Sequence, residues 1–212
     1  MEYKKSNINL QVASVEETVH NILTDLHFLP GQLEKVEVDL KDDFFIQLPK
    51  AQFAFVLSNI IRNAFKHGGP SKVEIRSENN KLIIKDDGKG IPEENLERIF
   101  QMHYTTGKKG DSSGIGLWFS KIIINTFNGE IWCNSQQGTS SYTEFTIKFP
   151  ELDPSKITEE DRKRINEQKT NRNKEMGKQE IAREMLKKGK SPEEIESRTG
   201  LKPTKIEKYK IK

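Results

Sequence analysis

Cysteine is almost absent from the 212-residue chain, in which Cys133 is the only one. A single cysteine excludes an intrachain disulfide and a cysteine-rich zinc site, and it suits a reducing cytoplasm. Long apolar runs are also missing, because the longest cover about five to seven residues whereas a membrane-spanning helix needs about 20. No apolar stretch of signal length follows Met-Glu-Tyr-Lys-Lys at the start. We therefore expect a cytoplasmic protein with no membrane segment in this chain.

Charge is plentiful but unevenly placed. Charged residues make up 32% of the chain and apolar residues 33%. Residues 1–150 contain 17 Lys/Arg and 19 Asp/Glu, whereas residues 151–212 contain 18 and 13. This shift predicts a folded domain at 1–152 and a basic helical tail at 153–212. Basic appendages are more often solvated helices than nucleic-acid-binding elements, so nucleic acid is the less favoured partner.

Hydrophobic spacing in the first 152 residues predicts an α/β fold. Helical spacing begins at the capping box Ser14-Val-Glu-Glu17 and returns at 50–66 and 116–127. Apolar–polar alternation predicts strands at 36–40, 44–48, 72–76, 82–85, 130–133 and 143–149. Between strand and helix, the glycine-rich segment from Asp86 to Gly116 contains a predicted short helix at 93–100. A connection of that length is usually functional.

The tail has its own predicted helices. The charged segment 156–188 predicts one long exposed helix with an apolar face only at its end. Ser191-Pro-Glu-Glu194 is a second capping box, and its helix ends at Thr199-Gly200. A last helix follows at 203–209. These helices are loosely like a helix-turn-helix, but the last one is short and lysine-bearing, so a packing or oligomerisation element is the favoured interpretation.

Three polar segments carry candidate chemistry. Asn59 and Asn63 lie four residues apart on one helical face, and we expect Lys66 to continue it. Carboxamide oxygens suit Mg²⁺, and an ammonium group suits phosphate. Asp86 precedes Gly88 and Gly90, and glycines at alternate positions let the backbone turn sharply and approach a ligand closely. A carboxylate held behind them can accept a hydrogen bond from an exocyclic amine. The third segment, 107–117, is a glycine-rich run that leads into a helix and is a ready anion site. Alone, each also fits an exposed polar face, a turn or a flexible loop.

The order of these segments resembles the catalytic, ATP-binding domain of sensor histidine kinases. Asn59-Ile-Ile-Arg-Asn63-Ala-Phe-Lys66-His67 is similar to the N box of that family, and Asp86-Asp-Gly88-Lys-Gly90 is similar to its first glycine box. Phe100 matches the F box, and Gly114-Ile-Gly116-Leu117 matches the second glycine box. The resemblance covers roughly residues 8–150. It implies a Bergerat ATP-binding fold, a two-layer sandwich of a mixed sheet and helices.

The resemblance also implies roles for matching positions. Asn59 and Asn63 should hold Mg²⁺, and Lys66 should contact phosphate. Asp86 should recognise the adenine amine with the help of Thr143, and residues 101–114 should form a lid in which Lys108 or Lys109 reaches the γ-phosphate. Ile91 should be a pocket wall and Phe100 a core residue. The implied nucleotide-binding set is Asn63, Asp86, Gly88, Gly90, Ile91, Thr106, Gly114, Gly116, Leu117 and Thr143, and the implied catalytic pair is Asn59 and Lys66.

Asn59 distinguishes kinase from ATPase. ATPases similar in fold, such as gyrase, have a glutamate there that acts as a general base on water, and a carboxamide cannot take a proton. We therefore expect an ATP-dependent protein histidine kinase of a two-component system. None of the four histidines fits a phosphoacceptor, so the acceptor should lie on a separate dimerisation domain, with a response regulator beyond it. The alternative is a non-enzymatic, nucleotide-responsive interaction module that binds DNA through residues 177–212. Those residues also resemble the helical tails of a transposase/nuclease family.

Overall fold

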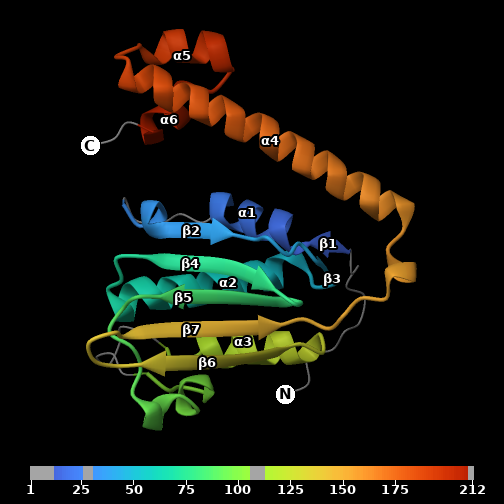
Figure 1. Cartoon of the computed structure of the whole chain (residues 1–212), viewed down its shortest axis with the longest axis vertical. Helices are drawn as coiled ribbons and strands as arrows, with labels where there is room; N and C mark the ends of the chain where they lie inside the picture. Colours follow the sequence, from blue (N-terminus) through green and yellow to red (C-terminus); the bar gives the residue numbers. More distant parts are fainter. Residues whose placement is uncertain (1–11, 26–30, 106–112, 210–212) are drawn as a thin grey trace. The chain divides into compact units, whose positions relative to one another are not determined.

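The chain divides into two compact units, residues 1–161 and 162–212, in the computed structural model (Figure 1). The structure describes residues 12–25, 31–105 and 113–209. None of the helices in these ranges is both long enough and apolar enough to cross a membrane.

A five-stranded mixed sheet forms one layer of the first unit. Its strands are β2 (Val36–Asp39), β4 (Val73–Glu78), β5 (Lys81–Asp86), β7 (Tyr142–Lys148) and β6 (Glu130–Gln136), in that spatial order. β2 and β4 are parallel, whereas the other neighbours are antiparallel. A separate pair joins β1 (Ala13–Ser14) to β3 (Phe45–Ile46). Alternating burial along β4 matches the predicted period of two.

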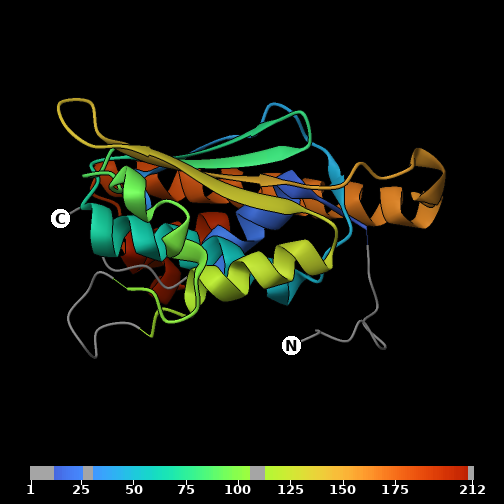
Figure 2. The ribbon, with the colours of Figure 1, turned by 90° about the horizontal axis from the view of Figure 1, so that it is seen from below.

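Three helices form the second layer: α1 (Val15–Asp25), α2 (Lys50–Asn63) and α3 (Gly116–Thr126). Figure 2 shows them on one side of the sheet. Their apolar stripes pack on the inner sheet face, and Phe53, Leu57 and Ile60 of α2 are almost fully buried. The Glu17 N–H donates to Ser14 Oγ at 3.2 Å, as the capping box predicts. The predicted two-layer α/β fold is confirmed.

Two segments that the sequence predicted as helix form short π-helical or 3₁₀ turns instead. α2 ends at Asn63 and is followed by a π-helical turn at Ala64–Gly68, where the sequence predicted α-helix to residue 66. The predicted helix at 93–100 is two 3₁₀ turns, Glu93–Asn95 and Arg98–Phe100. Two further 3₁₀ turns lie at Leu33–Lys35 and Pro154–Lys156. The π-helical turn and the two 3₁₀ turns between residues 93 and 100 contribute walls of the cavity described below.

The second unit is helical. α4 (Glu159–Lys187) begins just before the unit boundary, and α5 (Pro192–Thr199), α6 (Pro203–Ile206) and a 3₁₀ turn (Glu207–Tyr209) follow. A small apolar core of Ala182, Ile195, Leu201 and Ile206 holds these helices together. The unit therefore has a core of its own.

Candidate functional site

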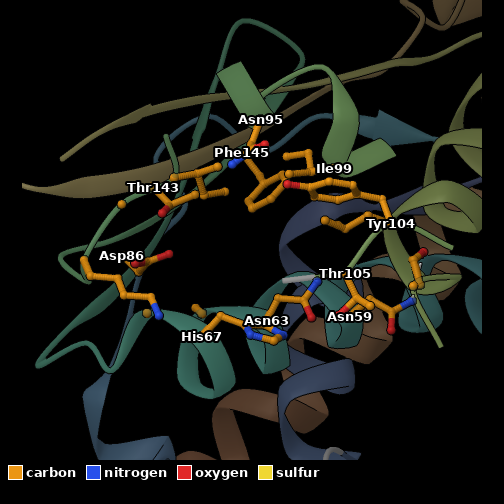
Figure 3. A pocket seen from close by; sticks show the side chains of 18 of the residues that line it. Asn59, Asn63, His67, Asp86, Asn95, Ile99, Tyr104, Thr105, Thr143 and Phe145 are labelled. Atoms are coloured by element: carbon orange, nitrogen blue, oxygen red, sulfur yellow. Dashed lines mark hydrogen bonds between the residues drawn. The ribbon is translucent and has the colours of Figure 1, made fainter. Parts of the chain in front are cut away.

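A cavity of about 730 Å³ lies in the first unit, on the inner side of the sheet. Its walls come from α2 and the π-helical turn, from the end of β5 and the loop after it, from β7, and from the start of α3 (Figure 3). Nine of the residues that the sequence predicted line it. They are Asn59, Asn63, Asp86, Gly90, Ile91, Gly114, Gly116, Leu117 and Thr143.

Asp86 supplies a buried carboxylate at one end of the cavity. It is the last residue of β5, it is only 4% exposed, and it pairs across the sheet with Thr143 of β7. The Gly88 N–H donates to Asp86 Oδ1 at 3.0 Å, so Gly88 holds the carboxylate although it does not line the cavity. Burial raises the pKa of Asp86 to about 6, because desolvation outweighs the Gly88 hydrogen bond, and the charge of Asp87 adds to the rise. At pH 7 an ionised acceptor therefore faces the cavity.

Asn59 and Asn63 supply the carboxamides at the other end. Figure 3 shows them across the cavity from Asp86 and Thr143. The Asn59 Nδ2 group donates to Gly116 O at 3.4 Å, a long contact that links α2 to the first residue of α3. Within the described residues, no cluster of three or more His, Cys, Asp or Glu side chains could hold a metal ion. A metal here would therefore need oxygen ligands from a bound phosphate chain as well as from these amides.

The structure corrects the expected position of Lys66. Its side chain is exposed and does not line the cavity, whereas His67 does. His67 follows Asn63 at the same spacing of four residues that separates Asn63 from Asn59, and it lies in the π-helical turn at Ala64–Gly68. Burial, and then the charges of Lys66 and Lys89, lower the pKa of His67, which favours its neutral ring. The phosphate contact of Lys66 stays a prediction.

Apolar side chains form part of the cavity wall. Ile91, Ile99 and Phe145 line the cavity, and the Ile91 N–H is fixed by Ser135 Oγ at 2.7 Å. Phe100 is instead buried in the core, edge-on to Phe145 with ring centroids 6.2 Å apart. A wall of this kind beside a hydrogen-bond acceptor suits an aromatic heterocycle that carries an amine. Ile91 and Phe100 lie where the sequence predicted.

The two ends of the predicted lid lie side by side. The His103 N–H donates to Gly114 O at 3.0 Å, and the His103 Nδ1 atom lies 3.3 Å from Ser113 O. Tyr104, Thr105 and Ser113 line the cavity next to this contact. Thr106, Lys108 and Lys109 lie outside the described residues.

The sequence missed several lining residues. His67 follows Asn63 by four positions, and Phe145 follows Thr143 by two, so helical and strand periodicity could have indicated both. Ile99 directly precedes Phe100. Asn95 and Tyr104 come from irregular backbone, where no periodicity signals which side chains face inward.

Comparison with known proteins shows what this domain is similar to. Residues 50–153 match the family described as "Histidine kinase-, DNA gyrase B-, and HSP90-like ATPase". The chain is 36% identical over 129 residues to "CAI-1 autoinducer sensor kinase/phosphatase CqsS" of Vibrio cholerae, which covers 58% of this chain and 18% of that protein. It is 31% identical over 120 residues to "Sensor histidine kinase WalK" of Bacillus subtilis, covering 51% of this chain and 20% of the relative.

A solved structure has the same fold. "Mycobacterial sensor histidine kinase MprB" superposes with a TM-score of 0.54 at 18% identity, over 65% of this chain and 95% of that one. Residues 50–153 therefore match this ATPase class, and the two relatives that the chain is similar to are sensor kinases. The chain spans only about a fifth of the length of the two sensor kinases. Nothing in these comparisons supports the resemblance of residues 177–212 to a transposase/nuclease family.

Proposed function

We propose that this chain binds ATP with Mg²⁺ and transfers the γ-phosphoryl group to a histidine on a separate dimerisation domain. The observation that carries the proposal is the polarity of the cavity, with the carboxylate of Asp86 at one end and the carboxamides of Asn59 and Asn63 at the other. Adenine fits the first end, because its amine can donate to Asp86 and its ring can lie against Ile91, Ile99 and Phe145. The phosphates then extend toward α2.

Asn59 and Asn63 would hold Mg²⁺ together with phosphate oxygens. The ion neutralises charge on the phosphate chain and orients it. Thr143 supports the adenine end, and Leu117, Gly114 and Gly116 bring the start of α3 against the nucleotide. The N-terminus of α3 carries free N–H groups and a positive dipole end, which suit phosphate. Lys66 and Thr106 complete the proposed set.

Asn59 favours transfer over hydrolysis. An amide cannot remove a proton from water, so the residues of the cavity provide no base at this position. The attacking group must then come from elsewhere, and a neutral imidazole nitrogen of the partner is the proposed nucleophile. Its attack forms an N–P bond as the bond between the γ-phosphorus and the bridging oxygen breaks, and ADP leaves. A response regulator would receive the phosphoryl group in the next step.

Residues 1–152 are the proposed catalytic domain and residues 153–212 the proposed tail. We also propose a cytoplasmic location, because ATP and a reduced Cys133 are both found there. The dimerisation domain and the response regulator would be supplied in trans.

The test is a transfer assay. The chain is incubated with γ-labelled ATP, Mg²⁺ and a dimerisation domain from a kinase similar to it, and labelled acceptor is measured over time. We expect acid-labile label on the acceptor histidine, no label when that histidine is replaced, and little phosphate release without the acceptor. Tight ATP binding with no transfer to any acceptor would contradict the kinase proposal. That result would favour the rival, a nucleotide-responsive interaction module.

A further inference from the structure

The second unit contains two short helices joined by a tight turn. α5 has eight residues, and three residues, Gly200 to Lys202, separate it from α6 (Figure 1). The last turns of α4 pack against both through Ala182, Met185 and Leu186. The unit is therefore a three-helix arrangement with its own core.

Hydrogen bonds fix both ends of α5. The Glu194 N–H donates to Ser191 Oγ at 3.3 Å and the Ser191 N–H donates to Glu194 Oε2 at 3.0 Å, which completes the predicted capping box. At the other end, Thr199 Oγ1 donates to Ile195 O at 2.7 Å and accepts from the Leu201 N–H at 3.2 Å. Gly200 has φ 70°, which favours glycine, and its N–H donates to Glu196 O. The turn is thus fixed and not a flexible link.

The helices α5 and α6 and the turn between them each bury part of their residues, whereas the start of α6 is exposed. Ile195 and Thr199 of α5, Leu201 in the turn and Ile206 of α6 are buried. Lys202, Pro203 and Thr204, at the start of α6, are exposed. Two helices joined by a short glycine-containing turn, with the first turn of the second helix open to solvent, form the arrangement of a helix-turn-helix.

The second unit is rich in positive charge. Residues 162–212 contain 17 Lys/Arg and 8 Asp/Glu. Three exposed lysines, Lys187, Lys188 and Lys190, precede α5, and exposed Arg198 and Lys202 flank the turn. Glu194 is ion-paired with Lys190 at 3.0 Å. Glu193, Glu196 and Glu207 are also exposed, so Arg198 and Lys202 are the cations considered at the turn itself.

We propose that the second unit is a helix-turn-helix that binds double-stranded DNA. The first turn of α6 enters the major groove, where Thr204 can contact base edges, and the cations around the turn contact phosphates. This activity is separate from phosphotransfer and needs no residue of the cavity. It adds a direct output on DNA to a chain whose first unit binds nucleotide.

The test is fluorescence anisotropy of the full chain with a labelled duplex of about two helical turns, at 50, 100 and 200 mM salt. About four phosphate contacts predict roughly 100-fold weaker binding at 200 mM than at 50 mM. Arg198→Glu combined with Lys202→Glu should weaken binding at least about tenfold and flatten the salt dependence. The matched control is Lys163→Glu with Lys174→Glu, which makes the same change in net charge at exposed positions of α4 and should have a much smaller effect.

Three results would overturn the proposal: no duplex binding at 50 mM salt, an equal loss in the α4 control, or equally tight binding of a single strand of the same length. The first would point to a protein partner for this surface. Circular dichroism and ATP affinity of each variant report folding, and they separate failure of this proposal from failure of the phosphotransfer proposal. If charge reversal unfolds the helices, Arg198→Gln with Lys202→Gln gives the same comparison with a smaller expected loss.

Discussion

Asp86 is placed where its charge opposes folding. Desolvation raises its pKa from 3.8 to about 6, so the folded chain holds its proton more tightly than the unfolded chain does. A group with a raised folded pKa lowers the free energy of unfolding as pH rises from its unfolded pKa through its folded pKa. Above pH 6 the folded protein therefore retains a buried carboxylate at a cost in stability, as expected of a residue kept for binding.

Replacing Asp86 should reveal this cost. Asp86→Asn keeps the acceptor for the Gly88 N–H and removes the charge, so the variant should be more stable than the wild type by about 1–3 kcal/mol at pH 8. The gain should shrink to below about 1 kcal/mol near pH 4, where the folded wild type is protonated at this position and the unfolded chain is about half protonated. Urea unfolding at pH 4, 6 and 8 measures it. A gain that does not change with pH, or a loss at pH 8, would contradict the assigned pKa.

Residue spacing in the sequence identified cavity-lining residues only in regular secondary structure. Asn59 and Asn63 could be predicted because an α-helix places residues four apart on one face, and both line the cavity. Lys66 does not continue this series, because the same spacing of four residues leads from Asn63 to His67. Asn95 and Tyr104 were missed because turns and loops have no period.

The loop from β5 to the 3₁₀ turn at Glu93–Asn95 sets the position of Ile91 in the cavity wall. Gly90 has φ 74°, and a Cβ atom placed there would lie 2.0 Å from Gln136 O, an atom of β6. The loop therefore approaches the sheet edge more closely than any side chain permits. This contact also fixes Ile91, whose N–H is bound to Ser135.

A methyl group at Gly90 should be much more harmful than one at a comparable open glycine. Gly31 has φ 81° with nothing within 4 Å of its Cβ position, so in Gly31→Ala only the strain of a left-handed residue should lower the free energy of unfolding, by about 1–2 kcal/mol. Gly90→Ala must also displace backbone, so its free energy of unfolding should fall by at least about 2 kcal/mol more. Urea unfolding of both variants measures the difference. Equal losses would show that the close approach is absent.

Elements of the first unit were predicted well where burial is one-sided. The three helices, β4 and β7 all show clear periodicity, and the structure has them close to their expected bounds. The expected strand at 44–48 is only the two-residue β3, paired with β1 outside the main sheet. Pairing partners of this kind depend on contacts between distant segments, which a local pattern does not contain.

At the scale of the whole molecule, the order of motifs carried more information than any single motif. Asn59, Asp86, Gly114 and Thr143 lie in four separate segments, and the fold brings all four to one cavity. Resemblance to a family predicted that convergence, whereas spacing alone did not. The strand order and the hydrogen bonds that fix the turn between α5 and α6 came only from the structure.

The central claim is that the cavity binds ATP through Asp86. The most direct test is calorimetric titration of the full chain with ATP and Mg²⁺ at pH 8, comparing the wild type with Asp86→Asn and with the exposed control Asp39→Asn. The wild type and the control should bind one ATP with similar affinity. Asp86→Asn should stay folded and bind ATP at least about 100-fold more weakly, because the substitution removes a charge-assisted hydrogen bond and can present an amide donor to the adenine amine. Unchanged ATP affinity in Asp86→Asn would contradict the claim.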